Sequence, residues 1–299
     1  MKKTFGSKPE DRHESRFLIE EEEILSELAD KKGTSLFLGK YTENVVLEIF
    51  DRNGFFKKVQ KKGLWPLDYE LDSSAFPPSQ RLLVFYKTKN PENVIMDLKI
   101  KEGIFRFKNE LAATVSNAKF SFLFLDWLTV QNPLHRFSRE RPPLPGQTHP
   151  GLNLGRKTVD IFADLGKLNL NNGLMAYPAF FHIALVFFPR CRFINPEKTG
   201  EVLAIWKTFG KIEFSKLAWI VHLECLKKED GTVYKWESEE MVYPMCRELN
   251  KYFHSRSYKR KAKEAMKKKA YKIDWEGFAQ KFEAEMASLE GDSNPKPSS

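Results

Sequence analysis

Residues 120–130 read FSFLFLDWLTV, the most apolar strand-like run of the chain. Aromatic side chains fill this run, and Asp126 is its only charged residue. A strand that is apolar at nearly every position is typical of the middle of a sheet, where both faces are covered. We therefore expect residues 120–130 to lie mid-sheet, buried on both faces.

The segments after this strand predict a strand–helix–strand unit. Residues 131–154 are rich in proline and glycine, which excludes a helix and disfavours a strand. The pattern then predicts a helix at 154–168, a short strand at 174–177 and a short helix at 179–189. A loop as long as 131–154 inside a compact domain is usually functional or disordered.

Upstream of residue 120, period-two alternation begins at residue 67 and predicts a meander of strands. The candidate strands are residues 67–71, 82–86, 94–100 and 104–107. Helical spacing precedes them at residues 15–32 and again at residues 45–59, where Asn53-Gly54 interrupts the pattern.

Downstream of residue 193, the sequence predicts a helix at 198–209, a strand at 217–226 and a hairpin turn at 227–231. Residues 233–236 and 241–243 follow as strand candidates, and from there to about residue 289 the chain is charged and helical. These elements predict an α/β protein with a mixed, mostly antiparallel central sheet, flanked by helices and followed by a helical C-terminal extension.

The formal net charge of +9 is concentrated in one segment. Residues 251–272 contain ten Lys or Arg and one acid, Glu264, so this segment holds the whole excess and the other 277 residues are balanced. On a helical wheel these cations spread around most of the circumference. Tyr252, Phe253, Tyr258 and Tyr271 are interleaved with them and could either stack on bases or pack against the domain. The alternatives are a solvated extension and a weak contact with nucleic acid or an anionic surface through Lys251–Lys272.

Three cysteines without a Cys-x-x-Cys pair are too few for a disulfide framework and favour a reducing compartment. The first 32 residues carry no apolar core of signal-peptide length, so we expect a cytoplasmic protein. Residues 173–189 lack charged side chains but contain Pro178 and are short for a bilayer, so we expect no transmembrane segment.

The turn Asn153-Leu154-Gly155-Arg156-Lys157 precedes the predicted helix at 154–168. Together with Ala184, Phe188 and Phe193 downstream, it resembles the core motifs of the Gcn5-related N-acetyltransferase superfamily, over about a quarter of the chain. The resemblance implies a divergent member with an acyl-CoA N-acyltransferase-like fold. It implies acetyl-CoA or another acyl-CoA as co-substrate and an unidentified amine as acceptor. By the same resemblance, the cofactor-binding residues would be Val130, Gln131, Asn153, Leu154, Gly155, Arg156 and Lys157.

The sequence departs from the family pattern at positions that matter for catalysis. Phe188 stands where many members have a tyrosine proposed as general acid, and a phenyl ring cannot donate a proton. Pro150 and Asn153 replace other residues of the turn motif, and Arg192 replaces the glycine before Phe193.

The catalytic residues are therefore unknown at this point. The candidates for a general base are His182 on the short helix, His149 in the loop and Asp126 on the buried strand. The six histidines are dispersed, and we expect no metal site.

The expected organisation is a flexible N-terminus at residues 1–15, an acyltransferase-like α/β domain at 16–246, a basic helical extension at 247–290 and a disordered tail at 291–299. The expected function is acyl-CoA-dependent N-acyl transfer. The alternatives are a catalytically idle protein of the same fold that binds a ligand or partner, and a nucleic-acid-binding protein that uses the basic segment.

Overall fold

The fold is described by a computed structural model that covers residues 36–72, 74, 79–107, 118–138 and 142–292, without the side chains of Arg156 and of residues 290–292. The helix expected at residues 15–32 and the flexible N-terminus expected at 1–15 lie outside these residues, as does the expected tail beyond residue 292.

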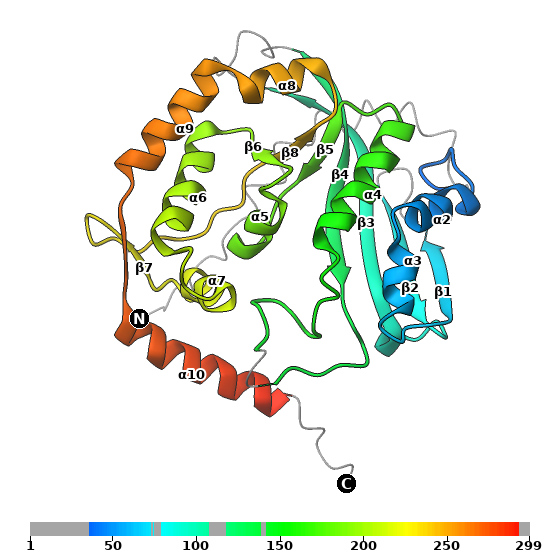
Figure 1. Ribbon diagram of the computed structural model, residues 1–299, viewed down its shortest axis with the longest axis horizontal. Helices are drawn as coiled ribbons and strands as arrows, with labels where there is room; N and C mark the ends of the chain where they lie inside the picture. Colours follow the sequence, from blue (N-terminus) through cyan, green and yellow to red (C-terminus); the bar gives the residue numbers. More distant parts are fainter. Residues whose placement is uncertain (1–35, 73, 75–78, 108–117, 139–141, 293–299) are drawn as a thin grey trace, which may run out of the picture.

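The centre of the molecule is a seven-stranded sheet with the order β1-β2-β3-β4-β5-β8-β6 (Figure 1). Neighbouring strands are antiparallel except for β4 and β5, the one parallel pair in the described part of this sheet. The strands are β1 (Leu67–Asp72), β2 (Gln80–Tyr86), β3 (Val94–Arg106), β4 (Lys119–Val130), β5 (Gly173–Ala176), β6 (Arg192–Phe193) and β8 (Met241–Pro244). A second small sheet joins β7 (Leu226–Lys228) to β9 (Tyr271–Ile273). The predicted α/β class and the mixed, mostly antiparallel sheet are confirmed.

Helices cover the sheet from both sides. The helices are α2 (Glu43–Arg52), α3 (Phe55–Gln60), α4 (Gly155–Leu168), α5 (Phe181–Phe187), α6 (Pro196–Phe209), α7 (Phe214–His222), α8 (Arg247–His254), α9 (Arg256–Lys268) and α10 (Trp275–Asp292), with a 3₁₀ turn, η3 (Pro91–Asn93). Helices α2, α3 and α4 share one apolar core with β2 and β3, and α5, α6 and α7 form a second core beside it. A third core, rich in phenylalanine and tyrosine, lies between β4 and the start of the basic segment in α8 and α9.

Local sequence explains where several helices begin. The Asn195 side chain accepts a hydrogen bond from the Glu197 N–H, and Pro196 occupies the first position of α6. Ser255 likewise accepts from the Tyr258 N–H and separates α8 from α9. Both residues satisfy backbone donors that a helix start leaves unpaired.

Strand β4 lies mid-sheet between β3 and β5, as predicted. Its first half is buried at Phe120, Phe122 and Phe124, but Trp127 is 56% exposed. The prediction of burial on both faces is therefore wrong for the second half. The reason is that β5 pairs only with Phe122–Leu125, and the aromatic core covers only the earlier phenylalanines.

The prediction of a strand at 217–226 is wrong, because most of this segment lies in helix α7. Leu217 to Val221 are all buried, and an apolar run buried on every side does not distinguish a strand from a helix by its period.

The separate candidates 94–100 and 104–107 are one continuous strand, β3. The break at Asn53-Gly54 is confirmed, because Gly54 has a positive φ of 71° between α2 and α3. The turn at 227–231 is confirmed by the hydrogen bond from Lys228 N to Thr232 O.

Candidate functional site

The pairing of strands β4 and β5 ends at Leu125. Their parallel pairing runs from Phe122 opposite Gly173 to Leu125 opposite Ala176, where β5 ends. Against β3, Leu125 pairs with Ile100 and Trp127 with Lys99, so Asp126 is an extra residue that forms a β-bulge. A bulge bends and twists its strand, and it is often found beside functional sites. The bulge of β4 thus begins directly after the last residue that pairs with β5, at the point where β5 ends.

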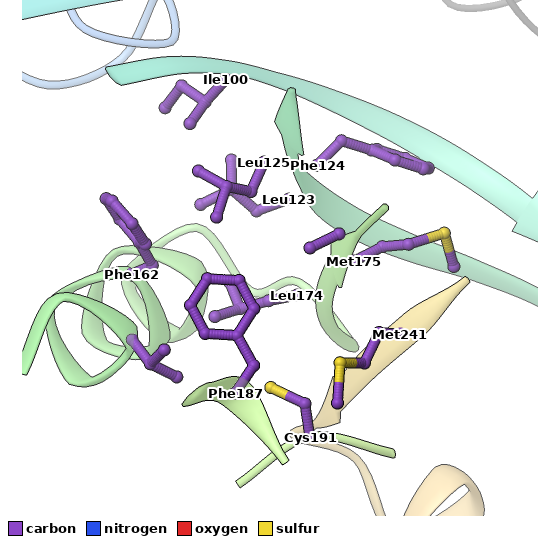
Figure 2. A pocket seen from close by; sticks show the side chains of 12 residues that line it. Ile100, Leu123, Phe124, Leu125, Phe162, Leu174, Met175, Phe187, Cys191 and Met241 are labelled. Carbon is purple, nitrogen blue, oxygen red and sulfur yellow. The ribbon is translucent and has the colours of Figure 1, made fainter. Parts of the chain in front are cut away.

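A small apolar cavity lies where the pairing of β4 and β5 ends (Figure 2). Its volume is about 20 Å³, with walls from β4, β5, α4 and α5 that include Leu125, Ala176 and Phe187. A space of this size is about the minimum for one water molecule, and an apolar lining offers water no partners. Figure 2 shows the rings of Phe162 and Phe187 turned toward the same space as Leu125 and Leu174. The cavity is an apolar gap in the core and too small for an acyl chain without movement of its walls.

Helix α4 begins at the loop that follows β4. Its N-cap residue is Leu154, which provides no side-chain hydrogen bond, and Asn153 before it has a positive φ of 57°. The N–H groups of the first turn, together with the helix dipole, form the type of surface that binds anions. A Cβ atom at Gly155 would lie 2.9 Å from Cγ1 of Val186, so the glycine allows α4 to approach α5 closely.

The cation predicted beside this turn has another partner. The ammonium Nζ of Lys157 donates to the backbone oxygen of Asn53 at 2.8 Å, at the end of α2. A cation there neutralises the negative end of a helix. Lys157 therefore joins α4 to the α2–α3 turn. For Arg156 only the backbone, in the first turn of α4, is described.

The end of β4 is held by the long loop. Gln131 donates its backbone N–H to Ile95 O at 2.8 Å and forms a bridge with Gly151. Asn132 N donates to Pro150 O at 2.8 Å. Val130 is half-buried at the edge of the first core. The backbone of Gln131 is thus already engaged on both sides.

The same loop also contacts helix α7 and the start of helix α5. Its Pro143 O accepts a hydrogen bond from Trp219 Nε1 of α7 at 2.7 Å. A Cβ atom at Gly146, whose φ is 77°, would lie 2.7 Å from the ring of Phe180. The described part of the predicted loop is therefore ordered by specific contacts.

His182, in the first turn of α5, is 2% exposed, and its Nδ1 has no hydrogen-bond partner. Its ring stacks on Phe180, with the centroids 5.5 Å apart. Burial, and to a smaller extent His222, lower the pKa of His182 to about 4. The imidazole is neutral near pH 7 and is a weaker base than a typical catalytic histidine.

The other two candidate bases belong to different surroundings. His149 Nδ1 lies 3.3 Å from Thr148 Oγ1, which in turn is 3.4 Å from Gln131 Oε1, so His149 is beside the end of β4. Burial and then Arg136 lower the pKa of His149. Asp126 lies at the bulge with a carboxylate oxygen 3.7 Å from Lys101 Nζ. The three candidates come from three elements and do not form one cluster by these contacts.

Sequence reasoning missed a surface groove between α5, α6 and α7. It has a volume of about 420 Å³ and is lined by Leu185, Val186, Phe188, Pro189, Arg192, Val202, Leu203, Trp206 and Phe214. The Arg192 guanidinium lies over the Phe188 ring, 5.0 Å from its centroid, and donates to the Phe188 and Cys191 carbonyls. The available signal was Trp206, an exposed tryptophan in the last turn of α6. Ala184 and Phe193 are fully buried and pack the second core.

Among the described residues, no group of three or more His, Cys, Asp or Glu is arranged to hold a metal ion. In the same part of the chain, no helix combines the length and the apolar character that crossing a bilayer requires. The chain matches no protein-family model and no curated protein. Its function therefore has to be argued from the residues and their geometry.

Proposed function

We propose that this chain is an acyl-CoA-dependent N-acyltransferase of the Gcn5-related type. The observation that supports this most is the end of the parallel β4–β5 pairing beside the Asp126 bulge, with the start of α4, which has no side-chain cap, following the β4 loop. In this proposal, the extended arm of the cofactor would lie beside the ends of β4 and β5, where their parallel pairing stops inside an otherwise antiparallel sheet. This agrees with the resemblance of the turn at Asn153–Lys157.

In the proposed complex, backbone groups would bind the cofactor's phosphates, and side chains would mainly surround its acyl end. The first-turn N–H groups of α4, starting at Gly155, would hold the coenzyme's pyrophosphate. The apolar walls at Leu125, Ala176 and Phe187 would surround the acyl end, after the gap between them widens. The acceptor amine would attack the thioester carbonyl, a C–N bond would form and the C–S bond would break. Because Phe188 has no proton to donate, the proton lost by the amine would pass through water to the leaving thiolate.

A catalytically idle protein of the same type is the second candidate. Two observations favour it: the phenyl ring at Phe188, and the pKa of His182, which burial holds near 4. Such a protein would still bind an acyl-CoA or a related anionic ligand, so binding and turnover have to be measured separately.

Binding is tested by the rise in melting temperature that acetyl-CoA produces. The informative variant is Asn153→Asp, which adds one negative charge to the exposed residue before α4 with almost no change in size. A charge there stabilises the free helix through its dipole but repels a phosphate, so we expect an unchanged or higher melting temperature and a smaller rise with acetyl-CoA. Gln60→Glu, an equivalent change at an exposed residue of α3, is the control and should keep the full rise.

The absence of any rise with acetyl-CoA and longer acyl-CoAs would rule out both candidates. Turnover distinguishes them: free thiol release with a panel of primary amines identifies the enzyme, and binding without thiol release identifies the idle protein. Equal rises in Asn153→Asp and Gln60→Glu would show that the ligand's phosphates do not lie at the start of α4.

A further inference from the structure

We propose that the outer surface of α8 and α9 binds the phosphate backbone of duplex nucleic acid without reading its sequence. This inference does not depend on acyl transfer. It starts from the charge distribution, because the whole net charge of +9 lies between residues 251 and 272, most of which form these two helices. A folded protein with its net charge in one place presents a strong local potential to a polyanion.

Four of the seven cations of α9 form a row along one face, and the exposed Lys259 and Lys268 lie to either side of it. Arg256, Arg260, Lys263 and Lys267 are exposed and follow each other at intervals of four, three and four residues, which is one face of a helix. Tyr258, Ala262 and Ala265 are buried on the opposite face. We call the first set the basic row. Its only acidic neighbour within α9 is Glu264, whose carboxylate is 3.9 Å from Arg260 Nε.

The buried face fixes the basic row to the body of the protein. Helix α9 lies along α6 at the margin of the molecule (Figure 1), and a Cβ atom at Gly200 of α6 would lie 2.3 Å from Ala262 O. The Tyr258 hydroxyl is 2.7 Å from Thr199 Oγ1 and donates to Phe193 O at 2.6 Å. Because the helix backbone is already fixed, binding does not have to order it, which favours a contact made by charge alone.

The burial of the aromatic residues indicates which kind of polyanion this surface can bind. Tyr252, Phe253 and Tyr258 are buried in the third core, so they cannot serve as the platforms on which single-stranded bases stack. Helices that lie in a membrane surface insert an apolar face, but here the apolar face of α9 packs on α6. Regularly spaced phosphates remain as the partner. The basic row extends over about 16 Å of helix at 1.5 Å per residue, and duplex DNA carries one phosphate per about 1.7 Å of its axis.

The test is fluorescence anisotropy with labelled duplexes of about 20 base pairs, two of DNA with unrelated sequences and one of RNA, at several KCl concentrations between about 50 and 200 mM. The matching single strands and phosphatidylserine vesicles are the comparison ligands. The variant replaces the four cations of the basic row by glutamine (Arg256→Gln, Arg260→Gln, Lys263→Gln, Lys267→Gln). The control replaces four exposed lysines in and after α3 (Lys57→Gln, Lys58→Gln, Lys61→Gln, Lys62→Gln), which removes the same net charge elsewhere.

We expect the full-length protein to bind two unrelated duplex sequences equally. Removal of the basic row should weaken binding about ten-fold or more at low salt and reduce the slope of log affinity against log salt by about 3 to 4, since each lost phosphate contact contributes about 0.9. The control should keep most of the affinity. Equal losses in both variants, no binding at about 50 mM KCl, or tighter binding to single strands or to phosphatidylserine vesicles than to duplexes would overturn the proposal. Unchanged melting temperatures of both variants establish that the loss is not due to unfolding.

Discussion

His182 is a buried titratable group whose protonation opposes folding. Its pKa is lowered to about 4 by burial, with a smaller effect of His222, from an ordinary value of 6.5. An unfolded chain takes up this proton at higher pH than the folded protein. Stability is therefore complete above pH 6.5 and is lost as the pH falls toward 4. The expected loss between about pH 7.5 and pH 5 is about 2 kcal/mol from this residue.

We predict that His182→Phe removes this part of the pH dependence, because phenylalanine keeps the ring contacts with Phe180 and Phe214 but cannot be protonated. Urea unfolding at the two pH values measures the difference. His222→Gln is the control: it removes the smaller cause and leaves the burial of His182, so most of the pH dependence should persist. If the wild type and His182→Phe lose equal stability on acidification, His182 is not buried as described.

Single residues also show what the sequence can predict about the candidate site. The turn at Asn153–Lys157 was located correctly at the start of a helix, because proline, glycine and helical periodicity are local signals. The partner of Lys157 was not predictable, because Asn53 lies 104 positions away and a long lysine side chain can reach in many directions. The bulge at Asp126 was equally hidden, since it depends on the register with β3.

At the scale of elements, two helical glycines differ in what surrounds them. A Cβ atom at Gly200 of α6 would lie 2.3 Å from the backbone oxygen of Ala262 and 2.7 Å from Cβ of Ala265, both in α9. A Cβ atom at Gly166 of α4 would meet the flexible end of Met245 at 2.9 Å. We predict that Gly200→Ala destabilises the protein by about 1–3 kcal/mol, because backbone atoms cannot move aside.

Gly166→Ala is the matched comparison and should change stability by less than about 1 kcal/mol, because the gain in helix propensity offsets the shift of Met245. Midpoints of urea unfolding measure both variants. Similar midpoints for Gly200→Ala and the wild type would mean that α9 does not pack on α6 at this distance.

The crossing of α4 and α5 gives a second prediction about elements. Gly155→Ala places a methyl carbon 2.9 Å from Cγ1 of Val186, which is too close for two carbon atoms that are not bonded. We expect it to destabilise the wild type by about 1 kcal/mol but to have little effect in a Val186→Ala background. A double-mutant cycle by chemical denaturation measures this coupling. Additive effects of the two substitutions would show that the helices do not meet there.

The elements that were predicted wrongly share a physical cause. Helix α7 is buried along Leu217 to Val221, so its sequence lacks the polar positions that reveal a period of 3.6. Strand β4 was predicted as fully buried because its sequence is apolar, although Trp127 remains exposed beyond the end of β5. In both cases the missing information was the arrangement of neighbours rather than the intrinsic preference of the residues.

At the scale of the whole molecule, the composition correctly indicated where the charge lies but not how the basic segment docks. Its cations spread around most of the circumference of α9, as expected, but the sequence did not show that Tyr258, Ala262 and Ala265 are buried on the side opposite the basic row. Small residues such as alanine give little signal in a sequence, because their burial depends on how closely a partner helix approaches. Here that approach depends on Gly200, more than fifty residues earlier.

Three distant segments meet at Trp219 and couple the loop after β4 to the C-terminal helix. The indole Nε1 donates to Pro143 O at 2.7 Å, and the ring contacts Phe282 of α10 with centroids 5.9 Å apart. We predict that Trp219→Phe releases the loop with a modest cost of about 1 kcal/mol, because it removes one hydrogen bond but retains an aromatic ring. Limited trypsin digestion should then cut faster within residues 131–154, where the bonds after Arg136 and Arg139 are cleavage sites.

Phe282→Ala is the comparison that removes the other contact of Trp219. It should lower the unfolding midpoint because it removes a side chain that packs against the second core. At temperatures well below the midpoint, it should leave the rate of loop cleavage close to that of the wild type. Faster loop cleavage in Phe282→Ala than in Trp219→Phe would show that the loop is held by the packing of α10. Faster cleavage in Trp219→Phe alone would show that it is held by the hydrogen bond to Pro143, and the loop beside the candidate site could then open without unfolding the rest of the protein.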